Sequence, residues 1–475
     1  MAGAAGMLRS VNPATGEELA SYAEHTAEEL DQALATAARA QRAWAQTSFA
    51  ERRRHLEAAA RLLREGRDGY ARLATQEMGK PIAEAEAELE KCAWNCAFYA
   101  ERGESFLADE PVDTDARASY VAYQPLGVVL AIMPWNFPFW QVLRFAAPAL
   151  MAGNGALLKH SPNVSGCALA IEELLARAGF PAGLFRSLLV GDASVAEATG
   201  RLLADPRIGA VTLTGSERAG AAVGATAGRA LKKCVLELGG SDPFLVLADA
   251  DLPLAAEAAA RARFLNGGQS CIAAKRFIVE EPVADEFERR FVDAVAALPV
   301  GDPLDRSTRL GPLARADLLT ALERQVEGSV AAGAKVLLGG GRLPGPGWFH
   351  APTVLAEVTP DMPVFREETF GPVAAVVRAA DEEAAVALAN DTPYGLGASV
   401  WTRDLDRAQR LGRRIESGSL FVNAVVASDP RLPFGGVKRS GYGRELAAAG
   451  IREFTNIRAF WIQPADAPPP ATLSE

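Results

Sequence analysis

Apolar residues recur at helical spacing through much of residues 26–105. The first of these segments starts at Thr26 and carries Glu29 three positions later, a pairing typical of a helix N-terminus. A second segment, EMGKPIAEAEAELEKCAWNCAFYAER, has Pro81 near its start, where a helix tolerates proline. This periodicity predicts that residues 26–105 are largely helical.

From residue 127 onwards the pattern changes to short apolar runs separated by helical stretches. The runs are GVVLAIM, ALLKH, FRSLLVG, GAVTLTG and KCVLELGG. A second alternating region begins near residue 240 with PFLVL and continues with AAKRFIV. Strands that alternate with helices in this way favour parallel sheets. The sequence therefore predicts an α/β protein with two doubly wound domains.

Two further segments stand apart from this alternation. RASYVAYQP, which lies between the helices and the first strand, alternates apolar and polar residues and fits a protruding hairpin. The tail ADAPPPATLSE is rich in proline and is expected to be loose.

The composition is that of a soluble globular protein. Hydrophobic residues make up 49% of the 475 residues, charged residues make up 23%, and the formal net charge is −10. An acidic balance disfavours nucleic acid or an anionic membrane as partner, because both bind clustered Lys and Arg. The start MAGAAGMLRS lacks a signal-peptide pattern, and no apolar run reaches the roughly 20 residues of a membrane helix.

The five cysteines are too scattered for a disulfide framework, so a reducing cytoplasm is the expected compartment. Cys92 and Cys96 lie four apart on a predicted helix without a histidine or acidic cluster, which favours buried helix residues over a metal site. Cys271 is different, because the stretch NGGQSCIAAKRF places it after a glycine pair in a polar turn. A thiolate nucleophile needs such an accessible turn.

Four other places have side chains suited to chemistry, each with a plainer alternative. Glu237 ends the apolar run in LELGG and is either a base with a raised pKa or a capping or salt-bridged residue. Lys159 ends ALLKH, at the edge where open α/β sheets bind ligands, although a rim lysine fits equally. The turn 215–220 could direct N–H groups at a phosphate or simply allow close packing. The loop MPWNFP at 133–138 could hold an oxyanion donor or be core.

Seven motifs together resemble the aldehyde dehydrogenase superfamily, almost end to end and in the order of that family: PWNFP, LLKHSPN, TGSERAG, LELGG, GGQSC, EETFGP and PFGGVKRSGYGRE. LLKH-x-PN, KKCVLELGGSDPF and AAKRF further resemble the bacterial NAD(P)-dependent succinate-semialdehyde dehydrogenases of this family. The resemblance implies NAD(P)+-dependent oxidation of succinate semialdehyde, or a similar short semialdehyde, through a cysteine thiohemiacetal and thioester. The implied cofactor is NAD or NADP, and no metal is implied.

The resemblance also implies a role for each matching residue. Cys271 would attack the aldehyde, the amide of Asn136 would help to hold the oxyanion, and Glu237 would activate the hydrolytic water. The residues that would bind the cofactor are Trp135, Lys159, Ser161, Gly215, Ser216, Gly220, Leu238, Glu368 and Phe370. Arg144, on the helix after PWNFP, would bind the substrate carboxylate, or would be a salt-bridged helix arginine instead. Arg431 could be a second contact with that carboxylate.

The family architecture divides the chain into three parts. A cofactor domain would comprise residues 1–105 and 127–238, and a catalytic domain would comprise 239–445. The hairpin 106–126 and the C-terminal segment 446–475 would form a flap that assembles a homodimer or homotetramer. The apolar strand RAFWI in this segment supports the expectation, since exposed apolar edge strands are normally paired or covered.

Three positions depart from the family pattern. Pro162 stands where strictly NAD-dependent relatives have a glutamate, so NADP+ is expected to be accepted. Ala273 replaces a second cysteine found in some relatives, and Leu265 replaces an arginine, which puts the details of the substrate pocket in doubt.

Three alternative functions stay open on the sequence alone. The first is a broad-specificity aldehyde dehydrogenase with another preferred aldehyde. The second is a cofactor-free thiol hydrolase, although none of the four histidines lies in a catalytic-looking loop. The third is a non-catalytic relative, against which the presence of Cys271, Glu237 and Asn136 argues.

Overall fold

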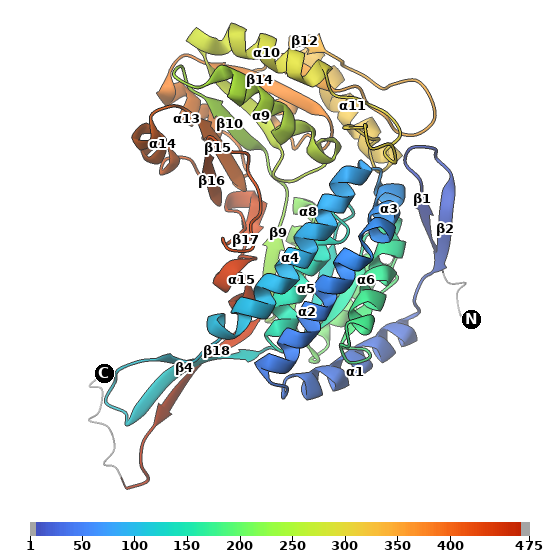
Figure 1. The fold of residues 1–475 in the computed structure, drawn as a ribbon, viewed down its shortest axis with the longest axis vertical. Helices are drawn as coiled ribbons and strands as arrows, with labels where there is room; N and C mark the ends of the chain where they lie inside the picture. The colour runs from blue at the N-terminus through green and yellow to red at the C-terminus, as the bar shows by residue number, and fades with distance from the viewer. Residues whose placement is uncertain (1–5, 467–475) are drawn as a thin grey trace.

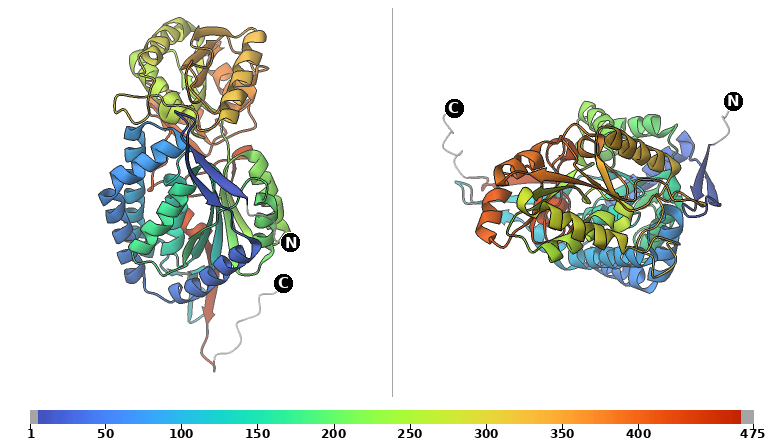
Figure 2. Two further views of the ribbon diagram at one scale, coloured as in Figure 1. Left: turned by 90° about the vertical axis from the view of Figure 1, so that its right-hand side faces the viewer. Right: turned by 90° about the horizontal axis from the view of Figure 1, so that it is seen from above.

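A computed structural model describes residues 6–466, which form two lobes and a projecting arm (Figure 1). A six-stranded sheet with its helices makes one lobe, and a seven-stranded sheet makes the other. Figure 2 shows the two lobes stacked along the long axis, with the arm at the end of the first lobe. The prediction of an α/β protein with two such sheets is confirmed. Of the described residues, none belongs to a helix long and apolar enough to cross a membrane.

The helical prediction for residues 26–105 is confirmed by four consecutive helices: α1 (Ala27–Trp44), α2 (Phe49–Glu65), α3 (Arg67–Met78) and α4 (Ile82–Phe106). The Thr26 side chain accepts a hydrogen bond from Glu29 N (3.2 Å), and the Glu29 carboxylate accepts one from Thr26 N (2.7 Å). These two bonds satisfy N–H groups that a helix start leaves without partners.

A hairpin precedes these helices, and the sequence analysis made no prediction for it. It consists of β1 (Met7–Val11) and β2 (Glu18–Ala23), which pair in antiparallel fashion. Its turn reaches the second lobe, where Trp348 N donates to Pro13 O (3.0 Å). The hairpin therefore ties the two lobes together at the edge opposite the arm (Figure 1).

The first sheet has the order β17-β9-β8-β5-β6-β7, and all of its strands except β17 are parallel. Its strands are β5 (Val128–Met133), β6 (Gly155–His160), β7 (Phe185–Ser187), β8 (Ile208–Thr214), β9 (Lys233–Glu237) and β17 (Gly441–Tyr442). The associated helices are η1 (Pro162–Val164), α5 (Trp140–Met151), α6 (Ser165–Arg177), α7 (Val195–Ala204) and α8 (Glu217–Arg229). Every residue of α5 is buried, because this helix runs through the core of the lobe.

The chain returns to this sheet near its end, in a way that the sequence did not indicate. After η4 (Lys438–Ser440), Gly441 of β17 pairs with Glu237 of β9. Gly441 has φ 116°, and a Cβ there would lie 1.9 Å from Leu236 O, so only glycine permits this pairing. The range 239–445, expected to form one catalytic domain, thus includes residues that complete the first sheet, because β9 would otherwise be an open edge.

The second sheet has the order β12-β13-β14-β11-β10-β15-β16, and only β12 is antiparallel to its neighbour. Its strands are β10 (Asp242–Val246), β11 (Ala274–Glu280), β12 (Lys335–Leu338), β13 (Thr353–Ala356), β14 (Val373–Ala379), β15 (Gly397–Trp401) and β16 (Ser419–Val422). The helices are α9 (Leu252–Phe264), η2 (Leu265–Gly268), η3 (Glu281–Val283), α10 (Ala284–Ala296), α11 (Ala316–Ala331), α12 (Pro363–Arg366), α13 (Glu382–Asn390) and α14 (Leu405–Gly412).

The arm is a three-stranded antiparallel sheet in the order β18-β4-β3. RASYVAYQP provides one strand of it, β4 (Ala118–Pro125), rather than a hairpin by itself. Its partners are the short β3 (Glu110–Pro111) and the C-terminal β18 (Thr455–Ile462), which follows α15 (Ala447–Glu453). A local alternation could not reveal a partner so far along the chain. The predicted loose tail lies outside the described residues from residue 467 onwards.

Candidate active site

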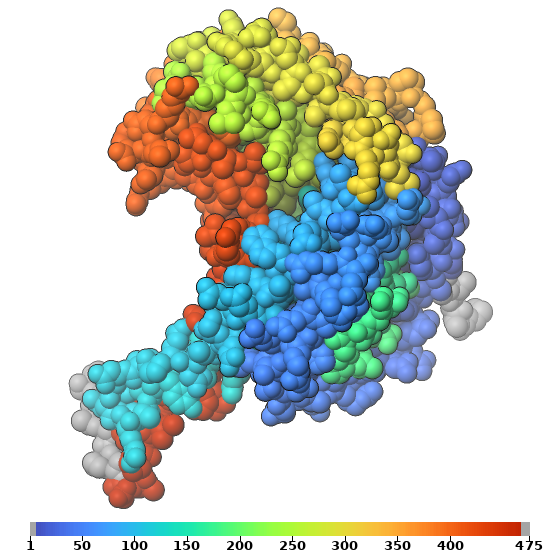
Figure 3. Space-filling model, viewed as in Figure 1, coloured from blue at the N-terminus to red at the C-terminus, as the bar shows by residue number. Residues whose placement is uncertain are grey.

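A cavity of about 590 Å³ reaches Cys271 from the side where the two lobes face each other. Its walls come from α4, from α5, from the segment that joins α9 to β11, and from the loop that follows β16. These segments meet beside the hollow that the space-filling view shows between the lobes (Figure 3). The ionisable residues that line the cavity are Glu84, Glu88, Lys91, Arg144, Arg261 and Cys271.

The backbone before Cys271 turns sharply through three residues with positive φ. Asn266, Gly267 and Gly268 have φ values of 56°, 63° and 71°. Asn266 tolerates this conformation because its Nδ2 donates to Asn136 O (2.9 Å) and to Gln269 O (3.0 Å). A Cβ at Gly268 would lie 2.2 Å from Gly371 O, so a side chain has no room there. The glycine pair noted in the sequence is thus required by the turn that presents Cys271.

Asn136 lies against this turn, as expected for an oxyanion donor. Its Nδ2 donates to Gln269 O (3.0 Å), two residues before Cys271, and the side chain is buried. An amide nitrogen has two N–H groups, so one is left to donate to a substrate oxygen. The structure therefore brings Asn136 to the loop of the nucleophile.

Lys275 supports the same loop, and the sequence analysis missed it. Its fully buried Nζ donates to the carbonyls of Ser270 (3.0 Å), Cys271 (2.8 Å) and Ala273 (3.2 Å). The signal available in the sequence was a lysine within the apolar run AAKRFIV, since a buried charge needs such partners. Lys275 therefore holds the backbone on both sides of Cys271 by hydrogen bonds.

The electrostatic environment of Cys271 has opposing contributions. Burial raises the pKa of the thiol to about 12, while the positive charges of Arg144 and Lys275 act to lower it. A reactive thiolate thus needs a further favourable charge or a base when substrate binds.

Glu237 ends β9 and is buried, with a relative exposure of 2%. Burial raises its pKa well above the usual value, the negative charge of Glu445 raises it further, and Arg144 acts in the opposite sense. Among the described residues, no group donates a hydrogen bond to either carboxylate oxygen. Its Oε1 would lie 2.7 Å from a Cβ at Gly435, so the carboxylate is directed at that glycine. The environment matches the hypothesis of a base with a raised pKa rather than that of a salt-bridged residue.

The position of Arg144 fits the interpretation of a salt-bridged helix arginine, although the residue also reaches the cavity. It lines the cavity together with Cys271, and its guanidinium also forms a buried ion pair with Glu445. Its Nη2 approaches Thr214 Oγ1 (3.4 Å), and its guanidinium carbon lies 4.8 Å from the centre of the Phe434 ring. The charge of Arg144 is therefore already compensated by a protein carboxylate.

Arg431 does not have the position expected of a substrate contact. Its side chain is 67% exposed, pairs with Asp429 (2.6 Å) and lies over the ring of Trp94. It is not among the residues that line the cavity. The ion pair with its near neighbour Asp429 holds Arg431 at the surface instead.

The residues expected to bind a cofactor lie at the carboxyl ends of the strands of the first sheet and in the facing segment of the second lobe. Lys159 is the penultimate residue of β6 and is buried, and burial lowers its pKa whereas Asp192 and Glu24 act to raise it. Ser161 follows and donates to Asn163 Oδ1 (2.7 Å). Trp135 packs edge-on against Phe370, with ring centres 5.7 Å apart.

The start of α8 offers N–H groups at the same edge of the sheet. Ser216 caps the helix by accepting from Ala219 N (3.3 Å), and a Cβ at Gly215 would touch only Leu213. Gly220 serves packing instead, because a Cβ there would lie 2.5 Å from the side chain of Leu238. Thus Gly215 and Ser216 are placed to meet an anion, while Gly220 allows α8 to approach Leu238 after β9.

Glu368 comes from the second lobe and faces the first. Its Oε1 accepts from Gly240 N (3.0 Å) and lies 3.8 Å from Lys275 Nζ. Burial raises its pKa. A helix N-terminus for phosphate, a buried lysine and an acidic acceptor are together suited to a dinucleotide, so the residues present fit NAD or NADP.

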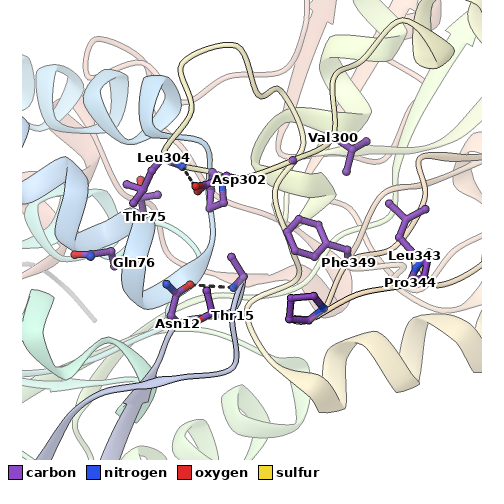
Figure 4. Close-up of a pocket in the computed structure, with 14 residues that line it drawn as sticks. Asn12, Thr15, Thr75, Gln76, Val300, Asp302, Leu304, Leu343, Pro344 and Phe349 are labelled. Carbon is purple, nitrogen blue, oxygen red and sulfur yellow. Dashed lines mark hydrogen bonds between the residues drawn. The ribbon is translucent and has the colours of Figure 1, made fainter.

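A second cavity of about 510 Å³ lies between the turn of the β1–β2 hairpin, α3 and loops of the second lobe (Figure 4). Asp302 is the one charged residue that lines it, and its Oδ1 accepts from Leu304 N (2.9 Å). No cysteine, histidine, lysine or arginine is among its lining residues. Residues 6–466 contain no cluster of three or more His, Cys, Asp or Glu able to hold a metal. Of the two cavities, the one at Cys271 thus has the described cysteine, lysine and arginine side chains in its lining.

Comparison with known proteins agrees with this geometry. The model of the aldehyde dehydrogenase family matches residues 1–460. A probable succinate-semialdehyde dehydrogenase [NADP(+)] of Synechocystis is 52% identical over 96% of this chain and 99% of its own length. The succinate semialdehyde dehydrogenase [NAD(P)+] of Escherichia coli is 51% identical over 95% of this chain and 97% of its own. The crystal structure of succinic semialdehyde dehydrogenase from Streptococcus pyogenes with NADP+ superposes with a TM-score of 0.93 at 37% identity, covering 96% of this chain and 100% of that one.

Proposed function

Because the chain belongs to the aldehyde dehydrogenase family, we propose that it oxidises succinate semialdehyde to succinate with NADP+, and that it also accepts NAD+. The observation that carries the proposal is the cavity in which the nucleophile Cys271 lies together with cationic side chains. A carboxylate at the far end of a short aldehyde requires a cation, because an unpaired buried anion is costly. Relatives named for this substrate, at about half identity over nearly the whole chain, support the same conclusion.

In the first half of the reaction, Cys271 Sγ forms a bond with the aldehyde carbon while the thiol proton passes to solvent water. The resulting oxyanion receives hydrogen bonds from Asn136 Nδ2 and from Cys271 N–H, two donors in a water-poor site. Lys275 keeps the backbone of Cys271 in place while this charge develops. NAD(P)+, held by the residues at the edge of the first sheet and by Glu368, would supply the acceptor for the hydride of the former aldehyde carbon.

In the second half, Glu237 removes a proton from the water that attacks the thioester. The C–S bond then breaks, the carboxylate product forms, and Cys271 regains its proton. Burial suits Glu237 to this role, because a carboxylate with a raised pKa is a stronger base once it is ionised.

The cofactor would be held by the residues at the edge of the first sheet. Gly215 and Ser216 at the start of α8 would meet the pyrophosphate, and Lys159 would meet the adenosine ribose or its 2′-phosphate. Pro162, at the start of η1, has no carboxylate to repel that phosphate. Glu368 would accept hydrogen bonds from the nicotinamide ribose.

A matrix of aldehydes and cofactors tests the proposal. We expect absorbance at 340 nm to grow fastest with succinate semialdehyde and NADP+. Cys271→Ala should abolish this signal but still bind NADP+, as measured by fluorescence titration. Ester hydrolysis without any dinucleotide reduction would favour the thiol hydrolase. A clear preference for another aldehyde would favour the broad-specificity alternative.

We further propose that the protein acts in the cytoplasm as a homodimer or homotetramer. The five cysteines all lie within the described residues and are free thiols, as is typical of a reducing compartment. Three large apolar side chains of β18, those of Ile457, Trp461 and Ile462, are 62%, 50% and 44% exposed in the single chain, which suits an interface.

A further inference from the structure

Three cationic side chains line the cavity at Cys271, and they differ in how their charge is compensated. Arg144 comes from α5, Lys91 from α4 and Arg261 from α9. Arg144 is buried and forms an ion pair with Glu445, so little of its charge is left for a ligand. Arg261 is exposed, where water screens its charge. Lys91 differs from both.

Lys91 is half-buried and held in a defined position without an anionic partner. Its Nζ donates to Ser428 Oγ (2.7 Å) and lies 4.4 Å from the centre of the Trp140 ring. Within residues 6–466, no carboxylate oxygen lies within 4.0 Å of this Nζ. An ammonium group has three N–H donors, so two are available to a ligand in the cavity.

The charged groups around Lys91 are directed elsewhere. Glu88, one turn earlier on α4, pairs with Lys80, and Asp429 in the loop after β16 pairs with Arg431. Cys92, the next residue on α4, has a thiol pKa raised well above its usual value by burial. The positive Arg144 faces Lys91 from α5. Asp429 and Glu88 still act to favour the charged form of Lys91, but among the described residues no carboxylate forms an ion pair with it. Glu84, which lines the same cavity, accepts from Asn266 N (2.7 Å), and burial raises its pKa to about 7.

We propose that Lys91 binds the carboxylate of the substrate and thereby sets the preference of the enzyme for acidic over neutral aldehydes. The inference rests on the proposed function and names the residue that would form an ion pair with the substrate carboxylate. A carboxylate brought to Lys91 would give an ion-pair partner to the one half-buried cation of this wall that has none among the described residues. Arg144 then acts mainly through its ion pair with Glu445, next to the base Glu237.

The titration of Lys91 gives the proposal a second signature. Burial lowers the pKa of Lys91 to about 8, and Arg144 acts in the same sense. Lys91 is therefore charged below about pH 8 in the free enzyme and loses its charge above it. Binding of a substrate carboxylate should therefore weaken as the pH rises through about 8, whereas binding of a neutral aldehyde should not depend on the charge of Lys91.

The test compares succinate semialdehyde with butanal, an aldehyde of the same chain length without a carboxylate. In Lys91→Met, kcat/KM for succinate semialdehyde is expected to fall about 10- to 100-fold, as for the loss of one charge-assisted hydrogen bond. Butanal turnover should change little, which also shows that the variant is folded. Lys91→Arg should restore most of the preference, because it restores the charge. Arg261→Gln serves as the matched control at the exposed cation and should leave the ratio of the two kcat/KM values unchanged.

The same ratio gives the pH profile, since titration of Cys271 or Glu237 affects both substrates and cancels. Glu84 does not cancel, because it lines the cavity and burial raises its pKa to about 7, so its ionisation also disfavours a carboxylate. In the wild type the ratio should fall as the pH rises from 7 to 9, and in Lys91→Arg it should fall less, only by the part that Glu84 causes. An equal fall in Lys91→Arg would place the pH dependence at Glu84 and overturn this role of Lys91. Equal losses for the two aldehydes in Lys91→Met, a selective loss in Arg261→Gln, or a wild-type ratio independent of pH would each overturn the assignment. Failure of the wild type to oxidise succinate semialdehyde faster than butanal would instead overturn the proposed function.

Discussion

At the scale of single residues, the site is built from ionisable groups that burial shifts away from their charged forms. Glu237 and Cys271 both have raised pKa values, and only part of this effect is offset by Arg144 and Lys275. Each group is therefore poised for proton transfer rather than permanently charged.

The base function proposed for Glu237 leads to a prediction about the second half of the reaction. Glu237→Gln should slow thioester hydrolysis by about 10²–10⁴-fold, because a positioned general base is lost. The acyl adduct on Cys271 should then be visible by mass spectrometry. In the wild type, single-turnover hydrolysis should become faster as the pH rises towards the raised pKa of Glu237, since the ionised form is the base. Hydrolysis as fast in the variant as in the wild type would remove Glu237 from this step.

The buried ion pair changes what is expected from Arg144. Arg144→Ala leaves Glu445 buried without a partner, which typically costs about 3–5 kcal/mol of unfolding free energy. The double variant Arg144→Met with Glu445→Leu removes both charges and should be the more stable of the two in urea unfolding. Both aldehydes should lose activity to a similar extent in Arg144→Ala. A loss confined to succinate semialdehyde would mean that Arg144 reads the carboxylate directly.

At the scale of elements, cofactor choice depends on how η1 begins after β6. Pro162 occupies its first position, three residues after Lys159. Pro162→Glu should shift the ratio of kcat/KM values from NADP+ towards NAD+, because a carboxylate accepts from a 2′-OH and repels a 2′-phosphate. Pro162→Gln is the control that changes the backbone in the same way without the charge. A wild-type preference for NAD+ above about a thousandfold, or roughly 4 kcal/mol, would contradict the argument.

At the scale of the whole molecule, the arm leaves apolar surface that a second copy of the chain would cover. Tyr120 of β4 and Phe460 of β18 stack within the arm, with ring centres 4.7 Å apart, while Ile457 and Trp461 stay exposed. Ile457→Asp combined with Trp461→Asp should lower the mass measured by light scattering, because charges are costly to bury in an interface. An unchanged mass would show that the arm does not hold the subunits together.

Much of the fold was predictable because it depends on local patterns. The capping pair at Thr26, the helices of residues 26–105 and the strands β5 to β11 follow from patterns within a few residues. The motif order indicated the family, and the glycine pair before Cys271 indicated an unusual turn. The alternative that Arg144 is a salt-bridged helix arginine was also available from the sequence.

What the tertiary structure alone decided is which distant groups meet. Arg144 pairs with Glu445, Lys91 donates to Ser428, and β17 closes the edge at β9. None of these partners can be inferred from neighbouring residues, because the free energy of a buried charge depends on whatever the fold brings within a few ångströms of it. The sequence by itself therefore determined most of the helices and strands and the family, and it singled out Cys271 as the candidate nucleophile. The tertiary structure decided which charges are compensated within the protein, and Lys91 is the cation at Cys271 that it leaves to a ligand.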